Sequence, residues 1–124
     1  MTATPRPLPD PDTVVTKATL RAAEMLGLNS AALAEVIGMS ESSVSRLKAD
    51  TKKISVKGKE GELALMLIRI FRSLDPLVGG VQEKRTAWMN SNNKALRGTP
   101  SQLIRKVDGL TRTLAYLDGM RAAT

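Results

Sequence analysis

The chain has 124 residues, 42% apolar and 25% charged, which is enough for one compact domain or for two small modules that share a core. It contains no cysteine and no histidine, which excludes disulfides and thiolate metal sites and removes the commonest general base. We therefore expect neither an enzyme nor a bound metal or cofactor. The net charge of +7 is typical of a surface that neutralises phosphate groups.

Membrane and targeting segments are not expected. The longest strongly apolar stretch, residues 63–68, is far shorter than a membrane span and lies in mid-chain. No apolar signal-peptide core follows the N-terminus. The sequence thus predicts a cytoplasmic protein without membrane contact.

The N-terminal region divides into an arm and a first helix. Residues 1–11 hold four of the six prolines and show no apolar periodicity, so we expect an extended arm. From Thr13 onward apolar residues recur at steps of three and four. Gly27 then provides a natural end to this helix.

Residues 30–49 fit two short helices joined by a three-residue turn. Ala34 is small, as it must be if the second helix crosses over it, and Gly38 can adopt the left-handed conformation of a tight turn. Val44 would fill the wedge between the helices, and Ser40 is a natural N-cap for a helix from Glu41 to about residue 49. The combination predicts a helix-turn-helix; an ordinary helical hairpin with a glycine turn is the alternative.

The second of these helices is the expected DNA reader. In a helix-turn-helix this element enters the major groove, where arginine pairs with guanine and glutamate accepts from cytosine. A basic stretch follows it: six basic residues and one acid lie between Arg46 and Lys59. The predicted DNA contacts are Ser40, Glu41, Ser42, Ser45, Arg46, Lys48, Lys52 and Lys53. For Arg46, a phosphate contact or a solvated charge remains the alternative to base reading.

Residues 62–74 form a helix that is apolar nearly all round. One face carries Leu63, Met66, Leu67, Ile70 and Leu74. In so small a chain we expect this face to contact a second copy, giving a homodimer. Burial inside one chain is the alternative. Asp75-Pro76 and Gly79-Gly80 are predicted to break the helix.

The last part of the chain contains three further helical segments by its pattern. A short helix is expected from about Val81 to Met89, followed by an asparagine-rich turn. Residues 99–102 read as a capping box that starts a helix containing Val107. We expect residues 108–109 to interrupt that helix and a final helix to end at Gly119.

Several short motifs of this region occur together in one known family. They are Arg69-Ile-Phe-Arg-Ser-Leu-Asp75, Trp88 followed by Asn93, Leu96-x-Gly98-x-Pro100, Leu103-Ile104, Gly109-Leu110 and Tyr116-Leu-Asp118. With the upstream helix-turn-helix, the chain resembles the Xre/MbcA/ParS antitoxins. The resemblance implies an all-α protein that neutralises a RES-type, NAD-consuming toxin and represses its own operon. It also implies that the last helix and tail close off the active site of the toxin.

These considerations predict three regions and a toxin-binding surface. The regions are a proline-rich arm (1–11), a DNA-binding module (12–60) and a dimerisation and toxin-binding module (61–124). The last helix would offer an apolar ridge with a cationic tip, made of Arg112, Leu114, Tyr116, Leu117, Met120 and Arg121. Simple surface charge is the alternative for the two arginines. For the whole chain, the alternatives are a stand-alone repressor and an adaptor that no longer binds DNA.

Overall fold

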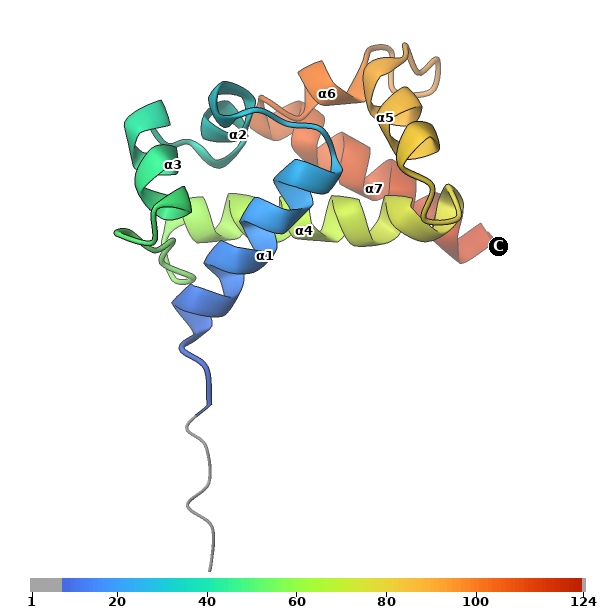
Figure 1. Cartoon of the computed structure of the whole chain (residues 1–124). Helices are drawn as coiled ribbons and strands as arrows, with labels where there is room; N and C mark the ends of the chain where they lie inside the picture. Colours follow the sequence, from blue (N-terminus) through green and yellow to red (C-terminus); the bar gives the residue numbers. More distant parts are fainter. Residues whose placement is uncertain (1–7, 124) are drawn as a thin grey trace, which may run out of the picture.

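The computed structural model describes residues 8–123 (Figure 1). Within them the chain is all-helical and has no strand, as predicted. The helices are α1 (Pro11–Met25), α2 (Ser30–Ile37), α3 (Glu41–Lys48), α4 (Lys59–Leu77), α5 (Gln82–Asn90), α6 (Pro100–Leu103) and α7 (Val107–Ala123). Most of the predicted arm, residues 1–7, lies outside the described residues, and Pro11 already occupies the first turn of α1.

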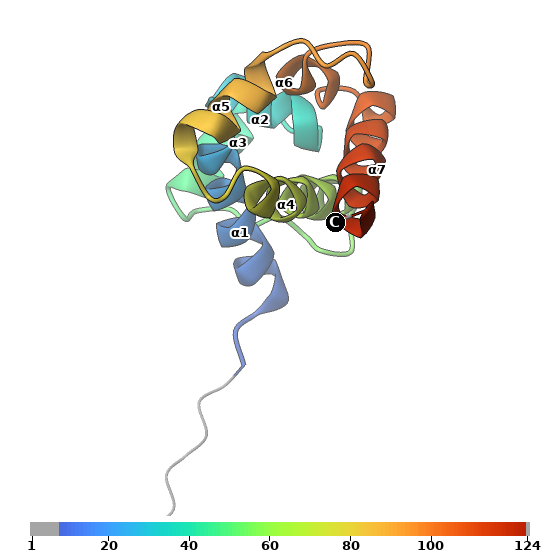
Figure 2. The same ribbon diagram turned by 90° about the vertical axis from the view of Figure 1, so that its right-hand side faces the viewer.

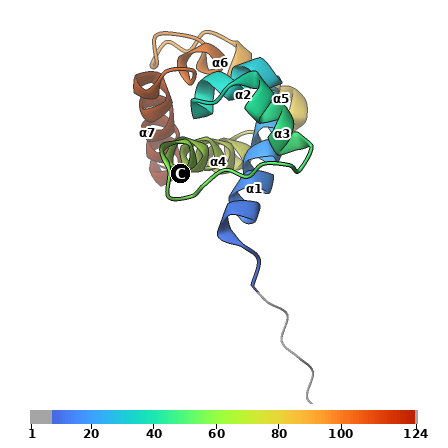
Figure 3. The same cartoon turned by 90° about the vertical axis from the view of Figure 1, so that its left-hand side faces the viewer.

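Helix α4 is the central element of the fold. Seen along its axis it lies between α1 on one side and α7 on the other (Figures 2 and 3). It also contacts α2, whereas α5 and α6 contact each other above it. A single hydrophobic core therefore runs from the helix-turn-helix region into the C-terminal half of the chain.

The apolar face of α4 is buried within its own chain, which corrects the predicted dimer surface. Leu63 is 8% exposed, and Leu67, Ile70 and Leu74 are completely buried. Met66 is half-buried against the same core. The four buried leucine and isoleucine side chains cannot contact a second copy without leaving this core. Helices α1, α2 and α7 cover this face, whereas we expected a chain of this size to leave it open to a second copy.

Proline 76 does not break α4, contrary to prediction. The helix continues through Pro76 to Leu77, and the two following glycines end it with positive φ angles of 63° and 70°. A proline removes one backbone hydrogen bond, here the one from residue 76 to the carbonyl four residues earlier, and α4 ends one residue after it. The N–H groups of Val78 and Gly79 still bond to carbonyls of the last turn.

The ends of the C-terminal helices also differ from prediction. The hydroxyl of Thr99 makes no capping bond, and α6 has only four residues. Val107, expected in the helix that starts there, is instead the first residue of α7 and is 61% exposed. Gly109 lies inside α7 rather than interrupting it, and α7 continues past Gly119 to Ala123. The glycines that suggested breaks are thus helical residues of α7.

Candidate DNA and toxin interfaces

The turn between α2 and α3 has the predicted geometry. Gly38 adopts a left-handed conformation with φ 71°, and the N–H of Met39 bonds to the carbonyl of Ala34 at 3.0 Å. Val44 is completely buried between the helices. The N–H of Ser43 donates to Oγ of Ser40 at 3.1 Å, so Ser40 is the N-cap of α3. These contacts fix the angle at which α3 projects from the molecule.

The outward face of α3 is accessible for DNA reading. Glu41, Ser42, Ser45 and Arg46 are all exposed. Among residues 8–123, the side chain of Arg46 makes no hydrogen bond or ion pair, so its guanidinium can turn toward a base without losing a partner. Ser40 differs from these four because its hydroxyl already bonds to Ser42 and Ser43 as part of the cap. Ser40 therefore holds α3 in place as its cap.

The three predicted DNA-binding lysines are exposed but have local partners. Lys48 donates to the hydroxyl of Ser30, and Lys52 donates to Oγ of Ser43 at 3.3 Å. Lys53 lies 3.6 Å from the carboxylate of Asp10, before the start of α1. Exposed contacts of this kind are weak, and Lys53 alone would have to leave a carboxylate to bind a phosphate.

The predicted apolar ridge of the last helix faces inward, which is a second correction. Leu114 is 5% exposed and Leu117 is completely buried, because both pack against the core beside α4. Arg112 is exposed and donates to the carbonyl of Leu96 at 3.2 Å. Tyr116 is half-buried, and Met120 is 38% exposed. A partner can thus reach Arg112, Tyr116, Met120 and Arg121, but not the two leucines.

The end of α7 is held to α4 by a polar network that the sequence did not reveal. Arg69 donates to Asp118 Oδ2 at 2.9 Å, and the hydroxyl of Ser73 donates to Asp118 Oδ1 at 2.9 Å. Arg121 in turn donates to the hydroxyl of Ser73 at 3.2 Å. The residues lie far apart in the sequence, so only the crossing of α4 and α7 brings them together. The cationic tip is therefore anchored rather than frayed.

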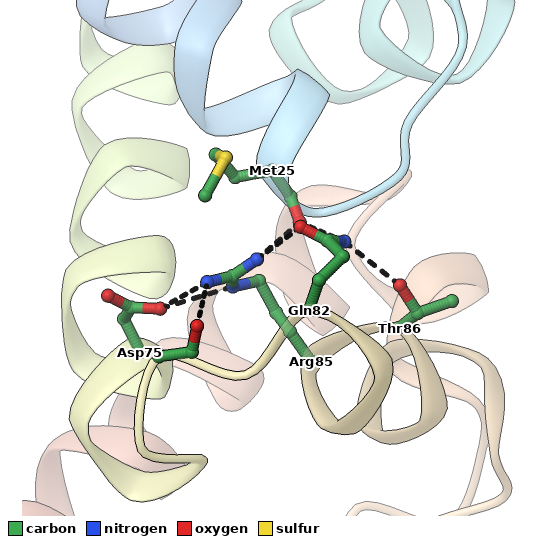
Figure 4. Close-up of polar contacts among 6 residues, drawn as sticks. Met25, Asp75, Gln82, Arg85 and Thr86 are labelled. Atoms are coloured by element: carbon green, nitrogen blue, oxygen red, sulfur yellow. Dashed lines mark hydrogen bonds and ion pairs between the residues drawn. The ribbon is translucent and has the colours of Figure 1, made fainter.

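A buried arginine joins the two halves of the chain (Figure 4). Arg85 is 1% exposed, and its Nη2 lies 2.6 Å from Asp75 Oδ1 near the end of α4. Its Nη1 donates to the backbone carbonyl of Met25 at 3.5 Å and to the side chain of Gln82. Its guanidinium also lies 5.5 Å from the ring centre of Phe71. The guanidinium thus contacts α1, α4 and α5 together.

Helix α1 explains why a cation is favourable at this place. Its last turn contains no basic residue, although the carbonyls of a helix C-terminus attract positive charge. Arg85 supplies that charge from α5, and Gln82 Nε2 donates to the same Met25 carbonyl at 3.2 Å. Sequence reasoning missed Arg85 because a single arginine in a polar helix is indistinguishable from a surface residue.

The C-terminal motif residues mainly shape the backbone between α5 and α7. The side chain of Asn93 accepts from the N–H of Leu96 at 3.0 Å, and the N–H of Asn93 bonds to the carbonyl of Gly98 at 2.8 Å. A Cβ on Gly98 would lie 2.9 Å from the side chain of Leu103. Trp88 is half-buried against the core. These motif residues therefore position α6 and α7.

Membrane-spanning helices and metal-binding clusters are both absent from residues 8–123. No helix among residues 8–123 is long and apolar enough to cross a membrane. The same residues contain no group of three or more aspartate, glutamate, cysteine or histidine side chains that could hold a metal ion.

Comparison with protein families assigns nearly the whole chain. Residues 6–69 match the antitoxin Xre-like helix-turn-helix domain, and residues 73–122 match the antitoxin Xre/MbcA/ParS C-terminal toxin-binding domain. No curated protein sequence matches the chain. The first match ends and the second begins inside α4. The chain therefore belongs to the Xre/MbcA/ParS antitoxins, a non-enzymatic family that combines a helix-turn-helix DNA-binding domain with a toxin-binding domain.

Proposed function

We propose that this antitoxin neutralises a RES-type, NAD-consuming toxin and represses its own operon. The observation that carries the proposal is the presence of both domains on one chain, with α4 shared between them. A stand-alone repressor would have no use for a toxin-binding domain. An adaptor without DNA binding would not need the basic stretch between Arg46 and Lys59, with its six basic residues and one acid. The RES class of the toxin rests on the resemblance of the C-terminal motifs.

The toxin class is tested by expressing the neighbouring gene product alone and together with this chain. Expressed alone, a RES-type toxin should deplete cellular NAD and arrest growth. Co-expression should restore both, and the two proteins should purify as one complex. A partner that arrests growth while NAD stays constant would show a different toxin class.

Neutralisation should depend on the end of α7. Removing residues 119–124 deletes Met120 and Arg121, two of the accessible residues of the predicted toxin surface. Growth protection should fall, while operator binding should persist because α3 lies at the other end of the molecule (Figure 1). The melting temperature should drop slightly, since the contact of Arg121 with Ser73 is lost. A truncated chain that protects cells fully would place neutralisation elsewhere.

DNA reading should separate Arg46 from Lys52. Arg46→Ala should reduce discrimination between operator and altered operator by about 1–3 kcal/mol, because arginine pairs bidentately with guanine. Lys52→Ala should weaken binding to all sequences alike and lower the salt dependence. Competition titrations at several salt concentrations distinguish these effects. Equal, sequence-independent losses from both variants would contradict the assignment of Arg46.

We further propose that the chain binds its operator as a homodimer, in the cytoplasm where that DNA lies. One α3 offers few base-reading side chains, and two copies on half-sites about one helical turn apart would supply the missing specificity. The contact must use a surface other than the buried face of α4. The same operator titrations measure this stoichiometry and should give two chains per operator.

A further inference from the structure

A cationic hollow lies where the C-terminal half of α4 meets the end of α7. It has a volume of about 460 Å³ and is lined by Arg69, Arg72, Ser73, Asp118, Arg121 and Ala122. Among residues 8–123, three guanidinium groups share it with one carboxylate, so these side chains give its walls a net charge of +2. Positive charges gathered around a concave surface favour the binding of an anionic group.

Two of the three arginines of this hollow, Arg69 and Arg121, are held in place before anything binds. Asp118 accepts from Arg69 with one oxygen and from Ser73 with the other, both at 2.9 Å. Arg69 retains further N–H donors, because a guanidinium has five. The network therefore orients donors around the hollow without neutralising it.

Arg72 is the side chain that this network does not use. It is exposed, and among residues 8–123 it makes no hydrogen bond or ion pair. It lies three positions after Arg69 on α4, where two like charges repel each other. Among residues 8–123, no second carboxylate lines the hollow to offset this repulsion. An acidic group from outside the chain would do so.

We propose that this hollow is the docking site for an acidic segment of the toxin. Ser73, Asp118 and Arg121 belong to the stretch matched as the toxin-binding domain. The hollow lies at the end of the molecule opposite α3, so the operator bound by this chain does not fill it (Figure 1). No aromatic side chain lines it to stack on a base, which disfavours a nucleotide. Exposed arginines hold a small anion weakly in water, whereas a protein partner that covers them excludes water and strengthens each ion pair.

The proposal rests on the toxin-binding assignment but not on the RES class, and the test keeps the two apart. The affinity of the co-purifying toxin for the full chain is measured by calorimetry at several salt concentrations. Arg72→Glu should weaken this affinity by about tenfold or more and reduce its salt dependence. Its melting temperature should be no lower than that of the wild type, because Arg72 has no partner to lose within residues 8–123 and its repulsion with Arg69 is removed. Its operator binding should be unchanged.

Arg21→Glu is the matched control. Arg21 is also exposed and is on α1, on the other side of α4 from α7 (Figures 2 and 3), and the substitution changes the net charge by the same amount. It should leave toxin affinity unchanged. Equal losses of toxin affinity in both variants would overturn the proposal, because net charge alone would then explain them. An unchanged toxin affinity of Arg72→Glu would also overturn it. It would also be overturned if inorganic phosphate or ADP bound the free chain through Arg72 without weakening the toxin complex. NAD consumption by the toxin, which tests the RES class, is a separate measurement.

Discussion

Arg85→Met should lower the free energy of unfolding by about 2–3 kcal/mol, a substantial fraction of the roughly 5–15 kcal/mol by which a native protein is stable. Methionine fills similar space but donates no hydrogen bond. It would leave the carbonyl of Met25 with the bond from Gln82 only, and Asp75 without its cation. Asp75 is 36% exposed, so water would compensate it in part. Thermal unfolding followed by circular dichroism should show a decrease of roughly 10 °C.

Two further variants define the cause of that loss. Arg85→Lys keeps the charge but cannot contact Asp75, Gln82 and Met25 through one planar group. Its free energy of unfolding should therefore lie between those of the wild type and Arg85→Met. Arg21→Met removes an exposed arginine and should change stability by less than about 0.5 kcal/mol. An Arg85→Met protein as stable as the wild type would mean that the buried contacts contribute nothing net.

Two glycines of α7 should respond in opposite directions to alanine. A Cβ on Gly109 would lie 2.0 Å from the backbone oxygen of Leu103 and 2.6 Å from its carbonyl carbon, so α7 or α6 must move. Gly109→Ala should therefore destabilise by about 3 kcal/mol, despite the higher helix propensity of alanine. A Cβ on Gly119 meets nothing within 4 Å, and Gly119→Ala should stabilise by about 0.5–1 kcal/mol.

Chemical denaturation of both proteins checks this prediction, and each variant is the control for the other. Both variants place the same methyl group on the same helix. Only at Gly109 does that group meet α6. If Gly109→Ala were also stabilising, the packing of α6 against α7 would be looser than described. The atoms of Leu103 that a Cβ at Gly109 would meet belong to the backbone. The decrease in the melting temperature of Gly109→Ala should therefore be largest if α6 cannot shift as a whole.

The helix-turn-helix was predictable because its constraints are local. Gly38, Ser40 and Val44 act within a few residues of one another, through a turn, a cap and one packing contact. The exposed residues of α3 follow from helical periodicity once the cap is placed. The roles of Arg46 and of the lysines in DNA binding stay predictions.

The C-terminal features were harder to predict because they depend on distant contacts. Gly109 suggested a break, yet its lack of a side chain serves the approach of Leu103 rather than a bend. Leu114 and Leu117 formed a ridge whose direction is decided by α4, more than 35 residues earlier in the sequence. The ion pair of Arg69 with Asp118 spans 49 positions. Periodicity indicates that a face is apolar but does not indicate which partner covers it.

The position of α4 has a consequence for how such proteins can be recombined. Cutting the chain between the two matched domains would sever α4 itself, exposing Leu67 and Ile70 on one fragment and Leu74 on the other. Neither fragment would retain the cover that its half of the core requires. A change of toxin specificity by exchange of the C-terminal half therefore needs a junction before Lys59, with the incoming α4 matched to the resident α1. The boundary between the two matched domains is therefore not a place where they can be exchanged.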